Sequence, residues 1–138
     1  MDKCINSPDW LKIPAIANIV IESWLFFNGM KYDLFCITVM SNHVHVIFKP
    51  LKKKDFPFSI SEIIKGAKTY TAREANKILG RVGQFWSREY YDHVIRNEDE
   101  FRYYFRYTLE NPVKAGLVNK AEDWKFYWVK EGLLTEGY

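Results

Sequence analysis

Two histidines separated by one valine are the residues whose spacing most directly suggests chemistry. In a β-strand, residues two apart project from the same face, so His43 and His45 would point one way while Val44 points toward the core. Two neutral imidazoles side by side can hold a divalent cation. The same spacing also fits two solvent-facing histidines on a half-exposed sheet, so on its own it leaves both interpretations open.

A later segment, residues 99–111, offers a nucleophile. Tyr103, Tyr107 and Asn111 follow at intervals of four and would share one face of a helix. A phenol with a pKa of about 10 attacks poorly unless a cation lies near the attacked group, and a metal that polarises a phosphate would supply that cation. The Asn111 amide oxygen could be a third ligand of the same ion. Taken without the histidines, Tyr107 reads as one of nine ordinary tyrosines, and Asn111 as a helix end before Pro112.

Basic residues are concentrated in one part of a chain whose net charge is only +3. Residues 49–88 contain ten lysines or arginines and three acidic residues, which favours a polyanionic partner such as nucleic acid. A solvated lysine-rich helix and loop would give the same composition. Aromatic residues make up 17% of the chain and could form core, a base-stacking surface, or both.

Length and composition predict one globular domain over residues 1–138. Apolar residues make up 48% and charged residues 27%, which excludes a disordered chain. No apolar run is long enough for a membrane helix, and the first residues do not resemble a secretory signal. Two cysteines, Cys4 and Cys36, exclude a disulfide framework and a four-cysteine zinc site. We therefore expect a cytoplasmic protein with no membrane partner.

The hydrophobic pattern predicts an α+β domain with a mostly antiparallel sheet and helices packed on it. Ser41 and Asn42 supply turn chemistry between two strands, and Ser59 with Glu62 has the spacing of a helix N-cap. The tail, residues 121–138, is aromatic and has no clear period. The expected elements are helix 13–27, strands 32–40 and 43–48 as a hairpin, helix 59–79, strand 85–95 and helix 97–111, ended by Pro112.

Four separated blocks, in order, resemble the single-tyrosine transposases of the HUH type (histidine, hydrophobic residue, histidine). Among these the similarity is to the REP-associated tyrosine transposases, within the IS200-like transposases. It extends over about residues 10–125, with the aromatic tail beyond it. The matching blocks are residues 39–50, 68–76, 84–96 and 107–118. The first block contains the two histidines, and the last begins at Tyr107.

The resemblance implies a fold of the HUH, ferredoxin-like arrangement and a strand-transfer activity. His43 and His45 match the paired metal ligands, and Asn111 matches a third ligand that is Gln in some relatives. Tyr107 matches the nucleophile, which forms a 5′-phosphotyrosine and leaves a free 3′-hydroxyl. The implied cofactor is Mg²⁺ or Mn²⁺, and the implied substrate is single-stranded DNA with imperfect hairpins. The basic residues expected to hold DNA phosphates are Lys52, Lys53, Lys54, Lys65, Lys68 and Arg73.

The sequence departs from these relatives at its beginning, where they carry a β-strand before the first helix. The sheet is therefore expected to lack one strand unless another chain supplies it, which makes a strand-sharing homodimer the expected assembly. Trp86, Tyr90 and Tyr91 could stack on bases or belong to the core, and His93 receives no role. A domesticated or truncated relative that binds nucleic acid without cleaving it is the main alternative. A metal phosphoesterase for small substrates would need a further ligand cluster, and the sequence offers none. As a transposase, the protein would be found with the nucleoid.

Overall fold

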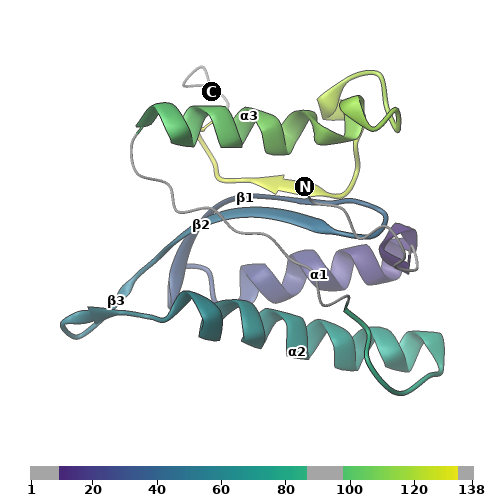
Figure 1. Ribbon diagram of the computed structural model, residues 1–138, viewed down its shortest axis with the longest axis horizontal. Helices are drawn as coiled ribbons and strands as arrows, with labels where there is room; N and C mark the ends of the chain where they lie inside the picture. The colour runs from purple at the N-terminus through teal and green to yellow at the C-terminus, as the bar shows by residue number, and fades with distance from the viewer. Residues whose placement is uncertain (1–9, 87–97, 134–138) are drawn as a thin grey trace.

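The computed structural model describes residues 10–86 and 98–133, and their elements form layers around a central sheet (Figure 1). Helix α3 covers one face of the sheet, and helices α1 and α2 lie on the other side (Figure 1). No helix within these two ranges is long and apolar enough to cross a membrane. The elements are η1 (Trp10–Lys12), α1 (Pro14–Phe26), β1 (Tyr32–Val39), β2 (Val44–Pro50), β3 (Lys52–Lys53), β4 (Phe56–Pro57), α2 (Ile60–Leu79), α3 (Glu98–Lys114), η2 (Ala121–Asp123) and β5 (Tyr127–Val129).

Helices α1 and α2 begin and end at the residues that the sequence indicates. Pro14 occupies the first turn of α1, where its missing N–H costs no hydrogen bond. The Ser59 hydroxyl accepts a hydrogen bond from the Glu62 N–H at 3.3 Å and caps α2. Gly80 ends α2 in the left-handed conformation, at φ 67°. The predicted bounds of both helices are confirmed to within one residue or so.

The predicted hairpin, β1 and β2, forms two strands of an antiparallel sheet with strand order β2-β1-β5, in which β1 is central. Alternation along β2 sends its side chains to opposite faces. Val44, Val46 and Phe48 pack into the larger core, together with α1 and α2. On the opposite face Ile47 joins a second cluster, in which Cys36 and the fully buried Phe105 of α3 take part. His43 and His45 therefore belong to the face of β2 that α3 covers.

The predicted end of α3 at residue 111 is wrong, because the helix continues through Pro112 to Lys114. Beyond the proline, the Ala115 N–H donates to the Asn111 carbonyl at 2.9 Å, and the Leu117 N–H donates to the Pro112 carbonyl at 2.9 Å. The Pro112 ring is fully buried. Burial of that ring against the rest of the molecule outweighs the local preference against helix before proline.

Three strands were not predicted from the sequence: β5, and the two strands of the β3–β4 hairpin. The aromatic tail contributes β5, which pairs with β1 through Cys36–Val129, Ile37–Trp128 and Thr38–Tyr127, so the sheet obtains its third strand from the chain itself. Lysines 52 and 53, expected in a loop, form the small hairpin β3–β4.

The predicted strand 85–95 is not formed at its first two residues, because Phe85 and Trp86 lie in a loop. Residues 87–95 lie outside the described residues.

Candidate active site

The histidine pair sits where the β1–β2 turn enters β2. The ring centroids of His43 and His45 are 4.9 Å apart and the ring planes are perpendicular, at 89°. The Nδ1 of His43 lies 2.8 Å from the Oδ1 of Asn42. The two atoms form a hydrogen bond in the tautomer that carries the proton on Nδ1, and in that tautomer Nε2 is the ring nitrogen that could bind a metal. The turn residue Asn42 thus orients a predicted ligand, a role that the sequence analysis missed.

The surroundings of His45 keep it neutral. Burial is the main cause that lowers its pKa from 6.5 to about 4, the charge of His43 adds to the effect, and a side-chain hydrogen bond with Asn111 opposes it. Near neutral pH the imidazole is therefore uncharged, which is the form that can bind a metal. The same hydrogen bond connects β2 to the last turns of α3.

Helix α3 brings Tyr107 to the histidines. The centroid of the Tyr107 ring is 5.7 Å from that of His45, with the ring planes at 88°. Since α3 is unbroken at Pro112, Tyr107 and Asn111 keep their helical spacing of four and lie on the same side of the helix. The structure thus brings together the four residues predicted from the sequence: His43, His45, Tyr107 and Asn111. Their chemical roles remain predictions.

The donor atoms at this place are two imidazole nitrogens and one amide oxygen. Among residues 10–86 and 98–133, no group of three or more His, Cys, Asp or Glu side chains could hold a metal. A mixed nitrogen and oxygen set without thiolates suits a divalent ion such as Mn²⁺, and Mg²⁺ with more difficulty, because Mg²⁺ prefers oxygen. The expected cofactor is therefore compatible with the residues present.

Two neighbours of Tyr107 were not singled out as parts of a site. The ring of Tyr103 stacks on that of Tyr107, with centroids 6.3 Å apart and planes at 25°. The Nζ of Lys114 lies 5.3 Å from the centroid of the Tyr107 ring. The interval of four between Tyr103 and Tyr107 was visible in the sequence, whereas Lys114 fell beyond the expected helix end and gave no signal.

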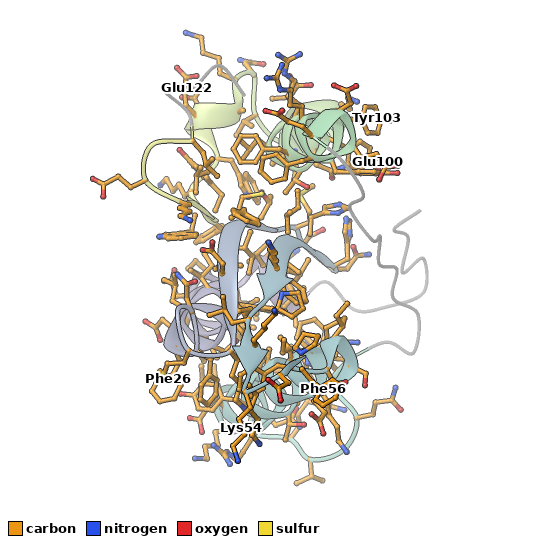
Figure 2. All side chains as sticks on the ribbon, turned by 90° about the vertical axis from the view of Figure 1, so that its left-hand side faces the viewer. Phe26, Lys54, Phe56, Glu100, Tyr103 and Glu122 are labelled. Carbon is orange, nitrogen blue, oxygen red and sulfur yellow. The ribbon has the colours of Figure 1, made fainter. Side chains whose placement is uncertain are left out.

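The basic residues of the β3–β4 hairpin lie away from the histidines. The histidines are at the start of β2, and the hairpin follows its far end (Figure 1). Lys52, Lys53 and Lys54 are exposed, and Lys54 occupies the turn at φ 62°. Figure 2 shows Lys54 and the exposed Phe56 at the opposite end of the molecule from Tyr103. These lysines could therefore contact DNA only at a distance from Tyr107.

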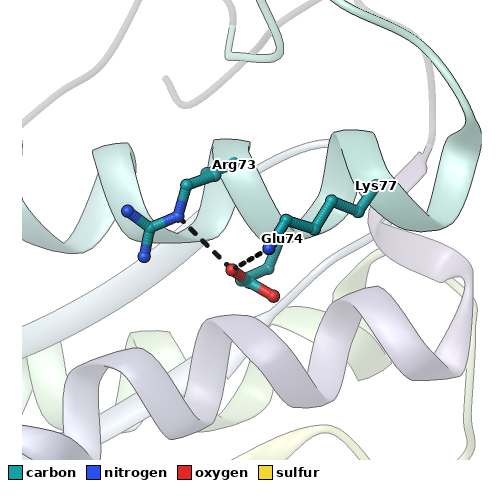
Figure 3. A network of polar contacts seen from close by, with 3 residues as sticks. All are labelled: Arg73, Glu74 and Lys77. Carbon is teal, nitrogen blue, oxygen red and sulfur yellow. Dashed lines mark hydrogen bonds and ion pairs between the residues drawn. The ribbon is translucent and has the colours of Figure 1, made fainter.

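The predicted basic residues of α2 lie in the layer opposite α3. Lys65 is exposed, and Lys68 places its Nζ 5.6 Å from the centroid of the Trp86 ring. Arg73 contacts Glu74, with 3.3 Å between Nε and Oε2, and Lys77 reaches the same oxygen at 3.2 Å (Figure 3). The hydrogen bond from Lys77 is the main cause that lowers the pKa of Glu74. The structure does not bring these residues to the histidine pair.

The remaining candidates are the possible base-stacking residues and His93. The indole of Trp86 donates to the Lys68 carbonyl at 3.0 Å, and its ring packs against Phe85, so Trp86 belongs to the core rather than to a base-stacking surface. Tyr90, Tyr91 and His93 lie outside the described residues.

Comparison with known proteins gives concordant matches. The family model described as "Transposase IS200 like" matches residues 23–110, well over half of the chain. The REP-associated tyrosine transposase of Escherichia coli K12 is 29% identical over 96 residues, which cover 69% of this chain and 53% of that protein. A Haemophilus influenzae protein, also described as a REP-associated tyrosine transposase, is 25% identical over 104 residues, which cover 69% of this chain and 57% of that protein.

A solved structure shares the fold. It is the structure of a REP-associated tyrosine transposase bound to a REP hairpin, with a TM-score of 0.67, 22% identity, and coverage of 90% of this chain and 70% of that one. The chain spans little more than half the length of the two sequence relatives above.

Proposed function

The chain belongs to the family of IS200-like transposases, and from that premise we propose that it cleaves and rejoins single-stranded DNA through a covalent bond to Tyr107. The observation that carries the proposal is the meeting of the His43–His45 pair with Tyr107, whose ring lies 5.7 Å from that of His45. A phenol whose ring contacts the neutral imidazole of His45, with a second histidine beside it, suits attack on a phosphate held at the same place.

In the proposed reaction the Tyr107 oxygen attacks a DNA phosphorus atom. The bond from phosphorus to the 3′-oxygen breaks, the phenol proton is passed to solvent, and the departing 3′-oxygen takes up a proton. The 5′-phosphate is then esterified to Tyr107. Attack of a second 3′-hydroxyl on this phosphotyrosine reverses the step and rejoins strands without ATP, because the ester retains the bond energy.

The residues that would hold a divalent cation are His43, His45 and Asn111. The Asn42 side chain contacts the Nδ1 of His43, and burial keeps His45 neutral. When bound, Mn²⁺ or Mg²⁺ would supply positive charge for the scissile phosphate and the departing 3′-oxygen. Asn111 also hydrogen-bonds His45, so its side chain ties the helix that carries Tyr107 to the strand that carries the histidines.

The proposed substrate is single-stranded DNA that contains a hairpin, as in the complex of the structural relative. The exposed lysines of the β3–β4 hairpin and the basic residues of α2 would contact its phosphates outside the active site. A homodimer stays part of the proposal; residues 1–9, before the first helix, lie outside the described residues, and β5 pairs with β1 within the chain.

The experiment incubates the protein with an oligonucleotide hairpin taken from the DNA beside its gene, in the presence of Mn²⁺, and looks for a covalent adduct on a denaturing gel. Tyr107→Phe should abolish the adduct, while the matched change Tyr70→Phe, on an exposed tyrosine of α2, should preserve it. An undiminished adduct with Tyr107→Phe would exclude Tyr107 as the nucleophile.

A binding module without cleavage is the second candidate, and the distance between the basic hairpin and the histidines favours it. It predicts that no adduct forms with any divalent metal. His43→Ala would then leave the affinity for the hairpin nearly unchanged, because the histidines would have no ligand role.

A further inference from the structure

A hollow along α3 has Tyr107 in its lining. Its volume is about 460 Å³. All its lining residues come from one stripe of the helix, and the stripe includes Tyr107 itself. The residues that line it are Arg102, Tyr103, Arg106, Tyr107, Glu110 and Lys114. Any strand whose phosphate reaches Tyr107 must continue on at least one side of that phosphate, and this hollow is the surface immediately next to it.

The hollow is electropositive. Three of its lining residues are basic and one, Glu110, is acidic. Arg102 is partly neutralised by Glu98, since its Nη2 lies 3.4 Å from Oε2 of that residue. Arg106 adjoins Tyr107 in the helix and the Lys114 ammonium lies over its ring, so the lining carries a net positive charge beside Tyr107. A DNA phosphate next to the cleaved one would meet complementary charge there.

The hollow also contains an exposed aromatic face. The Tyr103 ring is 62% exposed, a high value for a tyrosine of a folded domain (Figure 2). One side of the ring stacks on Tyr107, and its orientation is further fixed by an edge contact with Tyr104, with centroids 5.0 Å apart and planes at 84°. A fixed, exposed ring beside basic groups is the arrangement on which unpaired bases stack.

Lys114 reaches this place because α3 does not end at Pro112. One further turn of helix carries the lysine back over the Tyr107 ring, with Nζ 5.3 Å from the ring centroid. The ring of Tyr107 thus lies between the Tyr103 ring and the Lys114 ammonium. The burial of Pro112, which allows the helix to continue, thus also brings a basic group beside Tyr107.

We propose that Tyr103, Arg106 and Lys114 form a subsite for the nucleotide that adjoins the cleaved phosphate. Tyr103 stacks on its base, and Arg106 and Lys114 pair with its phosphate. The inference rests on the proposed function, because it takes Tyr107 as the residue that meets the DNA. Stacking accepts any base, so the subsite positions the strand without selecting its sequence.

The test is a cycle of binding measurements in the Tyr107→Phe background, which keeps the ring and removes cleavage. Hairpin oligonucleotides carry one abasic site, moved along the single-stranded flank, and affinity is measured by fluorescence anisotropy. With Tyr103 present, one abasic position should weaken binding about tenfold. With Tyr103→Ala the intact oligonucleotide should bind about tenfold more weakly, and the penalty at that position should disappear. Tyr70→Ala, the same change on α2, should leave the penalty in place.

A second measurement follows the salt dependence of binding. Lys114→Gln should make the slope of log K against log salt shallower by about 0.7, the value for one lost phosphate contact on a single strand. Lys120→Gln, on an exposed lysine beyond α3, should leave the slope unchanged.

If Tyr103→Ala keeps the tenfold penalty at that abasic position, or if Lys114→Gln leaves the slope unchanged, the subsite is refuted. These binding results do not depend on cleavage. An adduct on Tyr107 without the Tyr103 coupling would therefore refute the subsite alone, and the coupling without any adduct would refute the proposed reaction alone.

Discussion

The burial of neutral His45 makes the stability of the metal-free protein depend on pH. Burial, and after it the charge of His43, lowers the pKa of His45 from 6.5 to about 4 against the opposing hydrogen bond with Asn111. The unfolded chain takes up a proton near pH 6.5 and the folded protein only near pH 4, so the free energy of unfolding should fall as pH falls through this window. At about 1.36 kcal/mol for each pKa unit, the loss between about pH 7.5 and about pH 5 should be about 2 kcal/mol.

Urea unfolding at a series of pH values, with a chelator present, measures this loss. His45→Gln keeps an amide that can bond Asn111 and removes the titrating group. The nearby ionisable groups of His43, Tyr107, Glu110 and Lys114 are common to both proteins, so they largely cancel in the difference between the two curves. The variant should lose about 2 kcal/mol less than the wild type over this range. Parallel curves would mean that His45 is not held neutral by its surroundings.

Two further predictions concern the core beneath the site. Phe105→Ala should lower the free energy of unfolding by about 3–5 kcal/mol in urea titrations, because the side chain is fully buried between α3 and the sheet; a loss no larger than that of the half-buried Phe101→Ala would contradict this packing. Burial raises the pKa of the Cys36 thiol to about 12, against a backbone hydrogen bond with Ile47, so in a Cys4→Ser chain a thiol reagent should label Cys36 only after denaturation. Rapid labelling of the native protein would refute the burial of Cys36.

The elements that could be predicted are those with local signals. The helical period and the caps at Ser59 and Gly80 define α2, and the turn at Ser41–Asn42 between two β-rich runs defines the central hairpin. The proximity of His43 to His45 followed from strand geometry alone, and their arrangement with Tyr107 followed from the family resemblance. Alternation also predicted that Val44 and the histidines face opposite sides, as they do.

The features that were missed depend on contacts distant in the sequence. Strand β5 has only three residues, too few for a period, and it forms because β1 offers an unpaired edge ninety residues earlier in the chain, as the pair Cys36–Val129 shows. The rule that a proline ends a helix failed at Pro112 because the ring finds a buried place, which local sequence cannot reveal. The basic residues of α2 were predicted from charge, which carries no information about the layer in which a helix lies.

The packing that fixes α3 also explains why Tyr107 is both held and accessible. The buried residues of this helix are Phe105, Thr108 and Pro112, at intervals of three and four, so they form one stripe against the rest of the molecule. Tyr107 and Asn111 each precede a member of that stripe by one position, a rotation of about 100° around the helix. They therefore lie at its border, half-buried, and Tyr107 both contacts the His45 ring and lines the hollow. Because Pro112 anchors the last turn of that stripe, it also holds Asn111 within reach of His45. The residue that seemed to argue against a helical Tyr107–Asn111 pair is thus part of what keeps the pair in register with the histidines.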